Sequence, residues 1–401
     1  MQSIINNNEK YLRMLGLAGL LIFSIMFPAI PGRLTALFLC LFGLIAVFGK
    51  KELYNDWTLR IVFIVAFAIG MIDWHAGVPD NLKYMLIWPL SFVFGKWLVG
   101  NKKDDSEKNL VAASAVMTIG LFIQGVINYC NHNDGIEISE SWNGWNEIWT
   151  GNFMSRTVYT YDFLLVASTL FLAVLLFNKK RMLAIGIVIL NIATIVMDLI
   201  MARGRLQVVM QVAVTFIMLA IYLFNNRKKT SEKTKKLFII AVIAFVAAIV
   251  LFSVLVAFNV GGIGDAYDNS FLSRDGGILR NSRFRSMAEG LVLTFQQPLG
   301  GWETPSLGIA HNVFLLFAKE YDIIIFFILI AFEVFSLINA FKLILKKNCT
   351  YGDYLAFSML ITLLLYYNIK TCPWRYRSYW VILIITSGFI SQKLRMSAKE
   401  D

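Results

Sequence analysis

The chain has 401 residues, of which 58% are hydrophobic and 16% are charged, and its mean hydropathy is +0.64. This composition excludes an ordinary soluble globular domain, which carries more charge and fewer apolar residues. The net charge of +11 does not indicate a nucleic-acid partner, because the basic residues lie mostly in short loops between apolar runs. Apolar runs long enough to cross roughly 30 Å of hydrocarbon recur along nearly the whole chain, so the sequence predicts an all-α integral membrane protein.

The first apolar run follows Lys10 and Arg13 and has no convincing small-residue cleavage site, so we expect an uncleaved first span. Apolar runs between charged interruptions predict twelve transmembrane helices. They lie near residues 11–30, 33–49, 59–73, 81–99, 109–129, 158–177, 182–201, 206–224, 237–258, 322–345, 353–369 and 376–392. Twelve spans place both termini on the same side of the membrane.

Five basic loops decide the orientation. The segments "GKKELYNDWTLR", "NKKDDSEK", "NKKR", "NNRKKTSEKTKK" and "LKKN" all fall on one face, which the positive-inside rule assigns to the cytoplasm. The two long loops, 131–152 and 259–310, then lie outside. We expect three parts: transmembrane helices one to nine (1–258), a long outer loop with short helices and the catalytic segment (259–321), and helices ten to twelve with a cytoplasmic tail (322–401).

Lysine and arginine distribute differently over this topology. The outer segments hold three of the 22 lysines but ten of the 15 arginines. The ten are Arg33, Arg156, Arg203, Arg205, Arg274, Arg280, Arg283, Arg285, Arg375 and Arg377. Arginine offers a planar fork of donors suited to phosphate, so this excess indicates an anionic, phosphate-bearing ligand. The alternative is that these arginines pair with acids of the same loop, among them Glu289, or with lipid headgroups.

Two outer segments concentrate these arginines. In "MDLIMARGRLQVV", Arg203 and Arg205 occupy a tight turn at the membrane surface, where a lipid-linked phosphate would lie; snorkelling arginines in a short loop are the alternative. In "RNSRFRSMAEGLVLTFQQPLGGW", Arg280, Arg283 and Arg285 precede an amphipathic stretch that stops at Pro298 and Gly300. This stretch predicts a helix along the membrane surface, with Arg280 and Arg283 on one face where two forks could bind one pyrophosphate.

A third segment, "GIAHNVFLLFAKEYD", places His311 and Asn312 at the start of a short apolar helix. A histidine beside arginines is the natural general base, although a helix cap or an interfacial residue is the alternative. Neither the four cysteines nor any group of acids shows metal-binding spacing.

Some other residues have open interpretations. Asp198 could pair with Arg203 or Arg205, and Glu333 is the one acid in the middle of a span, where we expect it to hydrogen-bond between helices. Trp142, Trp145 and Trp149 either stack on sugar rings or mark the membrane interface.

In order and in motifs the chain resembles the O-antigen ligase and polymerase superfamily of bacterial envelopes. The likeness rests on "ARGR", on "SRFRSMAEGLVLTFQQPLGG" and on "HNVFLLFAKEYD", with Asp322 where the family motif continues with glycine. A fourth segment, "GKKELYNDWTLRIVFIVAFAIGMIDW" (49–74), is similar to lipopolysaccharide O-antigen ligases of Gram-negative bacteria. It favours a ligase over a polymerase.

The resemblance implies an enzyme of the bacterial inner membrane whose active site faces the periplasm. Its donor would be a glycan on undecaprenyl pyrophosphate, its acceptor a sugar hydroxyl of lipid A-core, and it would need no metal or other cofactor. Carried over by position, Arg203 and Arg283 would bind the pyrophosphate, with Arg280, Arg205 and Arg285 as further candidates. His311 would activate the acceptor, supported by Asn312. A polymerase with the same donor remains the alternative, and a lipid-linked glycan flippase the lesser one.

Overall fold

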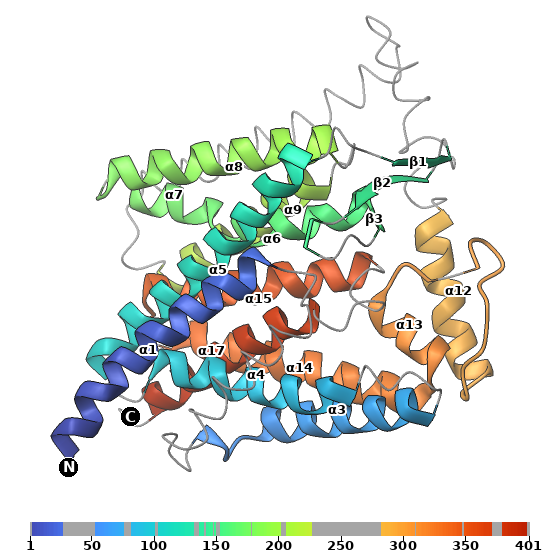
Figure 1. Ribbon diagram of the computed structural model, residues 1–401, viewed down its shortest axis with the longest axis horizontal. Helices are drawn as coiled ribbons and strands as arrows, with labels where there is room; N and C mark the ends of the chain where they lie inside the picture. Colours follow the sequence, from blue (N-terminus) through green and yellow to red (C-terminus); the bar gives the residue numbers. More distant parts are fainter. Residues whose placement is uncertain are drawn as a thin grey trace, which may run out of the picture. The chain divides into compact units, whose positions relative to one another are not determined.

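The apolar runs form α-helices in the computed structural model (Figure 1). The structure describes residues 2–26, 53–75, 82–100, 103–131, 136–139, 142–146, 148–149, 153–177, 179–201, 206–226, 282–308, 310–346, 349–370 and 379–398. The predicted spans 33–49 and 237–258 lie outside these residues, so the number of twelve spans stays a prediction.

The described helices follow the predicted spans closely. They are α1 (Gln2–Ile25), α3 (Trp57–His75), α4 (Tyr84–Val99), α5 (Lys103–Asn131), the 3₁₀ helix η4 (Arg156–Phe163), α6 (Leu164–Ala167), α7 (Leu170–Leu176), α8 (Arg181–Met201), α9 (Leu206–Asn225), α12 (Ser282–Gln296), α13 (Val313–Glu320), α14 (Ile323–Leu345), α15 (Tyr351–Ile369) and α17 (Tyr379–Ala398). Helix α1 differs most, because it starts well before the predicted span at residue 11.

Seven stretches of the described chain are helical, long and apolar enough to cross a membrane. They are Trp57–His75, Asp105–Asn131, Tyr159–Leu176, Arg181–Asp198, Leu206–Asn225, Ile323–Leu345 and Tyr351–Ile369. Large apolar side chains remain exposed along α3, α8 and α14, with Met182 at 81% and Ile324 at 63%. Such faces suit contact with lipid tails, so the protein is an α-helical membrane protein.

The chain divides into two compact units. Unit 1 comprises Met1–Met218, Phe327–Tyr367 and Cys372–Asp401, and unit 2 comprises Leu219–Phe326 and Asn368–Thr371. The predicted boundaries at residues 258 and 321 stay a prediction.

Within unit 1, α4 packs along α17, and α1 packs along α5 (Figure 1). Glycines allow α4 and α17 to approach closely: a Cβ added at Gly95 would lie 2.3 Å from the Ile385 carbonyl oxygen. The same close approach occurs on α17 at Gly388, where a Cβ would lie 2.3 Å from the Phe92 carbonyl oxygen of α4. Small residues at a helix crossing are typical of membrane proteins, since lipid tails compete with side chains for apolar contacts.

The predicted span 158–177 is not one continuous helix. It consists of η4, α6 and α7, with a turn between α6 and α7. At this turn Ser168 Oγ donates to the Leu165 carbonyl oxygen (2.6 Å), and Thr169 Oγ1 donates to that of Val166 (2.7 Å). Hydroxyls that bond the backbone in this way compete with regular helical bonds, which the apolar pattern alone did not reveal.

Other helices satisfy the backbone groups that the break leaves free. Gln207 Nε2 on α9 donates to the Phe163 carbonyl oxygen (2.9 Å), and Ser358 Oγ on α15 donates to that of Ser168 (2.8 Å). Irregular backbone inside a membrane protein is tolerated where the protein itself supplies such partners.

Two buried acids take part in hydrogen bonds of this broken helix: Asp162 on η4 and Asp198 on α8. Asn128 Nδ2 donates to Asp162 Oδ2 (2.7 Å), and Thr160 Oγ1 donates to Asp198 Oδ1 (2.8 Å). The predicted pairing of Asp198 with Arg203 or Arg205 involves residues outside the described part. The role expected for Glu333 stays a prediction.

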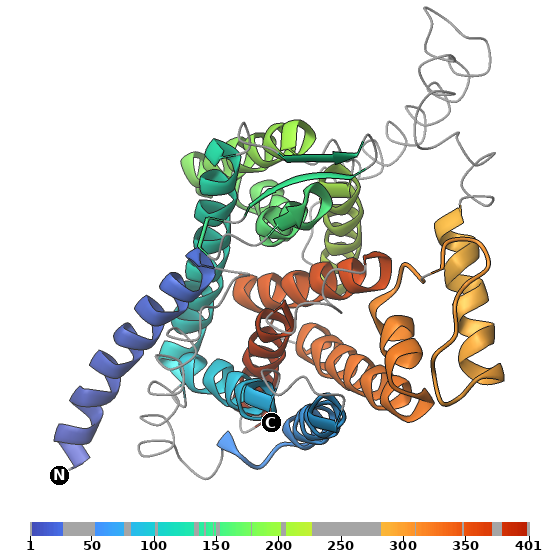
Figure 2. The ribbon, with the colours of Figure 1, turned by 45° about the vertical axis from the view of Figure 1, so that its right-hand side comes forward.

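A small antiparallel sheet stands where no regular structure was predicted. Strands β1 (Ile136–Ser139), β2 (Trp142–Asn146) and β3 (Phe153–Ser155) pair in sequence order (Figure 2). Trp149 lies between β2 and β3 in the sequence; its side chain is 36% exposed and donates through Nε1 to Gln124 Oε1 (2.8 Å). This bond holds the loop against α5, and it leaves both interpretations of the loop tryptophans open.

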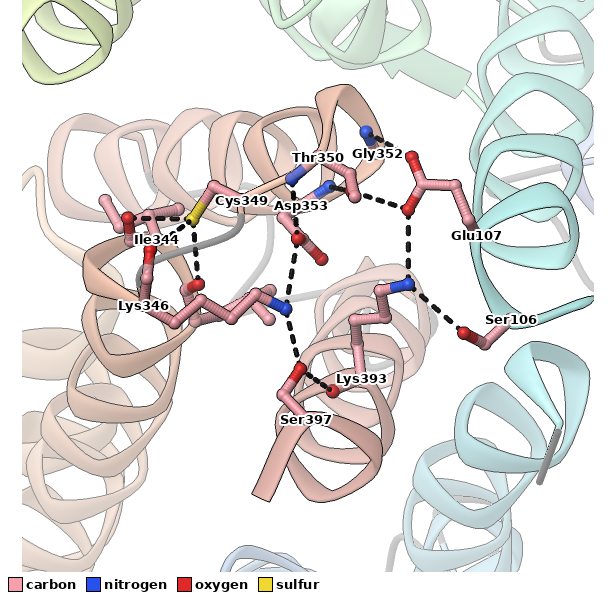
Figure 3. A network of polar contacts seen from close by, with 11 residues as sticks. Ser106, Glu107, Ile344, Lys346, Cys349, Thr350, Gly352, Asp353, Lys393 and Ser397 are labelled. Atoms are coloured by element: carbon pink, nitrogen blue, oxygen red, sulfur yellow. Dashed lines mark hydrogen bonds and ion pairs between the residues drawn. The ribbon is translucent and has the colours of Figure 1, made fainter. Parts of the chain in front are cut away.

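A polar network joins the ends of α5, α15 and α17 in unit 1 (Figure 3). The Glu107 carboxylate accepts from Thr350 Oγ1 (2.5 Å) and from the Gly352 N–H (2.9 Å), and it lies 3.2 Å from Lys393 Nζ. The predicted topology places all these helix ends at the cytoplasmic face.

The same network extends to the end of α14. Lys346 Nζ lies 3.1 Å from Asp353 Oδ2, and the Cys349 thiol donates to the Ile344 carbonyl oxygen (2.9 Å). Burial, followed by the nearby Asp353 charge, raises the pKa of Cys349 to about 12, so its thiol stays protonated at neutral pH.

Candidate functional site

The described part of the candidate site belongs to unit 2, where α12 and α13 lie side by side (Figures 1 and 2). Helix α12 carries Arg283 in its first turn and ends at Gln296, just before the predicted stop at Pro298. The predicted helix is therefore confirmed, and its position along the membrane surface stays a prediction. Arg203, Arg205 and Arg280 lie outside the described residues.

Arg285 is the one arginine of the predicted set whose side chain is described. Its side chain is 70% exposed, and its Nε lies 2.9 Å from Glu289 Oε1, one turn further along α12. An exposed pair of this kind contributes little stability. The alternative of pairing within the loop thus applies to Arg285, whose guanidinium is already oriented by an acid.

Glu289 also holds the loop that follows α12. Its second oxygen, Oε2, accepts from both the Ser306 N–H (3.0 Å) and the Ser306 hydroxyl (2.7 Å). The hydroxyl of Ser306, more than the guanidinium of Arg285, keeps the pKa of Glu289 below its ordinary value. One carboxylate therefore ties the arginine-bearing helix to the loop that leads to His311.

A tight turn joins the end of α12 to the end of α13. The Gly301 N–H donates to the Lys319 carbonyl oxygen (2.6 Å), and the Ile323 N–H donates to the Pro298 carbonyl oxygen (2.8 Å). Gly300 has a φ of +80°, and a Cβ there would lie 2.6 Å from the Lys319 carbonyl oxygen. Only glycine meets both demands, so "PLGG" sets how closely the two helices approach at this end.

The loop is fastened from the α13 side as well. Lys319 Nζ donates to the Gly308 carbonyl oxygen (3.2 Å). Close to the site, Gly290 of α12 leaves room for Ala310 and the Trp302 ring, since an added Cβ would lie 2.9 Å and 3.1 Å from them. The described residues of this loop thus contact both α12 and α13, and the loop leads to His311.

Asn312 is the N-cap of α13. Its Oδ1 accepts from the Leu315 N–H (3.0 Å), and its Nδ2 donates to Asn368 Oδ1 (3.0 Å). Half-buried His311 directly precedes this cap. The prediction that His311 and Asn312 open a short helix is confirmed, and the anchored cap restricts where the imidazole can lie.

Asp322 departs from the glycine expected by the resemblance, and the structure explains why. Its Oδ1 accepts from the Ile325 N–H (2.8 Å), so Asp322 caps the start of α14. Helix α13 ends at Glu320, and only two residues separate it from α14. The departure affects the start of the next helix, and His311 still directly precedes the cap of α13.

The structure therefore brings two of the three predicted segments together. The helix of Arg283 and the helix that begins after His311 are packed, tied at one end by "PLGG" and along the loop by Glu289. Sequence reasoning treated Glu289 only as a possible partner of the arginines and missed Ser306 and Asn368. The spacing of four residues from Arg285 to Glu289 was a usable signal, whereas nothing in the sequence links Asn312 to Asn368.

The chemistry offered here is that of guanidinium, imidazole and amide groups. Among the described residues, no group of three or more His, Cys, Asp or Glu side chains is arranged to hold a metal ion.

A scan against protein-family models and a search of curated proteins find no match to the chain. The resemblance to O-antigen ligases therefore rests on the four short segments quoted above.

Proposed function

We propose that the protein is a glycosyltransferase of the O-antigen ligase type in the bacterial inner membrane. It transfers a glycan from undecaprenyl pyrophosphate to a sugar hydroxyl of lipid A-core on the periplasmic side. The observation that carries the proposal is the packing of α12 on α13, with the loop between them bound to both helices. This arrangement keeps a segment rich in arginine and a histidine on one small scaffold.

The reaction is a single displacement. The acceptor oxygen forms a bond to the anomeric carbon of the glycan, whose bond to the pyrophosphate oxygen breaks, and undecaprenyl pyrophosphate leaves with the electron pair. His311 takes the proton of the acceptor hydroxyl, and the configuration at the anomeric carbon inverts. Arg283, with Arg203 and Arg280, stabilises the charge that grows on the leaving group.

The placement of buried charge supports an enzyme over a flippase. A transport path is expected to carry charge along the middle of its spans. Among the described residues the buried charged residues lie instead near helix ends: Asp73, Lys96, Asp162, Asp198, Asp353 and Lys393. Glu333, the one acid in the middle of a span, is half-buried.

The decisive experiment uses purified protein in nanodiscs with the lipid-linked donor and lipid A-core. We expect His311→Ala to lower the transfer rate about 10²- to 10⁴-fold, as for loss of a general base. Arg283→Ala should lower it about 10²- to 10³-fold, as for loss of a fixed charge stabiliser. His75→Ala is the matched control, because His75 is a second histidine that lies at the end of α3, outside the candidate site. Full activity of stably inserted His311→Ala protein would refute the proposal.

The acceptor distinguishes a ligase from a polymerase. A strain without a ligase loses all O-antigen on lipopolysaccharide core, whereas one without a polymerase retains core that carries a single repeat unit. Lipopolysaccharide gels of a deletion strain therefore decide the acceptor.

A further inference from the structure

One side of α12 is built for close packing within unit 2. Ser286, Gly290 and Thr294 are buried and spaced by four residues, so they form one stripe along the helix. Gly290, in the middle of this stripe, faces the Trp302 ring and Ala310. The large apolar side chains of α12 take no part in it.

Those apolar side chains lie on another side of the helix. Leu291, Val292 and Phe295 are 47%, 53% and 57% exposed, and Leu299 in the following turn is 88% exposed. Positions 291, 292 and 295 share one side of a helix, and nothing in the described part of the chain covers them fully. An exposed apolar stripe on an amphipathic helix marks a surface with a partner.

The position of Leu299 indicates what that partner is. Its neighbour Pro298 accepts a hydrogen bond from the N–H of Ile323, the first residue of α14 (2.8 Å). Helix α14 has 23 residues and is a candidate span, so its length of roughly 34 Å matches the hydrocarbon core. Ile323 therefore lies near the membrane boundary, and Leu299 lies at the same level.

The arginines near the start of α12 also indicate a bilayer as the partner. Arg285 is 70% exposed, and Arg280 and Arg283 precede it in the sequence. Basic groups beside an apolar stripe match a bilayer, whose phosphates lie just outside its acyl chains. We propose that α12 is an interfacial helix that inserts Leu291, Val292, Phe295 and Leu299 into the outer leaflet. It then holds Arg283 at the depth of lipid phosphates.

The test measures depth directly and needs no substrate. All four native cysteines are replaced by serine, and a nitroxide is attached to a single cysteine at Val292, Phe295, Leu299 or Gln296 in nanodiscs of phosphatidylethanolamine and phosphatidylglycerol. Gln296 is the control at the edge of the stripe, because it is exposed and lies about 100° around the helix from Phe295 and about 40° from Val292. We expect nitroxides at Val292, Phe295 and Leu299 to relax more with oxygen than with a polar nickel complex. The preference for oxygen should be smaller at Gln296.

Three results would overturn the inference. One is stronger relaxation by the nickel complex than by oxygen at all four positions, which means that the stripe faces water. Another is low accessibility to both reagents, which means that protein covers the stripe. The third is spin–spin broadening that disappears on dilution with unlabelled protein, which means that a second copy covers it. Because no transfer is measured, any of them can occur while the His311 results stand, so this inference fails separately from the proposed function.

Discussion

Gly300 allows the closest test of how α12 and α13 are held together. Changing Gly300 to alanine imposes two costs. A positive φ of +80° costs an L residue roughly 1–2 kcal/mol. In addition, the new Cβ would lie 2.6, 2.9 and 3.0 Å from the backbone oxygens of Lys319, Tyr321 and Ala318, which cannot rotate away.

Gly301 separates these two costs. Its φ is +77°, nearly that of Gly300, but a Cβ there meets nothing within 4 Å. Gly301→Ala should therefore cost only the backbone strain, about 1–2 kcal/mol. Gly300→Ala should cost about 2 kcal/mol more, in the usual range for overpacking a closely packed site.

The measurement is hydrogen exchange at the Ile323 amide, which donates to Pro298 across this turn and is unchanged in both variants. An extra 2 kcal/mol corresponds to about thirtyfold faster exchange in Gly300→Ala than in Gly301→Ala. Transfer activity should fall in the same order, because the turn fixes the approach of the two helices. Equal exchange in the two variants would refute the contact between the turn and the end of α13, and with it the argument for a shared scaffold.

Three further predictions concern other parts of the molecule. Glu107→Ala removes the acceptor of three polar contacts and should destabilise the protein by about 3 kcal/mol in chemical unfolding, whereas the exposed Asp105→Ala should change stability by less than about 0.5 kcal/mol. With a pKa of about 12 in place of the ordinary 9.0, Cys349 holds roughly a thousandfold less thiolate near pH 8. A single-cysteine protein with Cys349 should resist maleimide in intact and lysed cells alike, whereas one with the exposed Cys130 should react with an impermeant reagent from outside. Because the pKa of Glu289 is lowered from 4.5, its bond to Ser306 stabilises the loop in full above that pH and is lost as the pH falls through the lowered value. Protection of the Ser306 amide, measured relative to its intrinsic exchange rate at each pH, should therefore decrease as the pH falls below 4.5 in the native protein, and it should not do so in Glu289→Gln.

Local patterns predicted the parts of the fold that depend on local chemistry. The end of α12 before Pro298 and the start of α13 after Asn312 follow from proline, glycine and capping residues, which act within a few positions. The break in residues 158–177 was missed, because serine and threonine hydroxyls on the backbone leave the apolar pattern unchanged. The strands of residues 136–155 were missed because they are short and carry no clear alternation.

Contacts between segments far apart in the chain could not be predicted from the sequence. The bonds from Asn312 to Asn368 and from Gln207 to the Phe163 carbonyl join residues far apart in the chain. An apolar period tells which side of a helix avoids water, but it does not tell which other helix that side meets.

By itself the sequence determined that this is a helical membrane protein, where most of its helices run, and which arginines and which histidine are candidates for chemistry. Those features depend on composition, on helical period and on residues close together in the chain. The tertiary structure alone decided that Glu289 binds Ser306 while orienting Arg285, that "PLGG" brings α12 to the end of α13, and that an apolar stripe of α12 is left exposed. These depend on which backbone oxygens and side chains meet after folding, and close packing between elements sets those contacts.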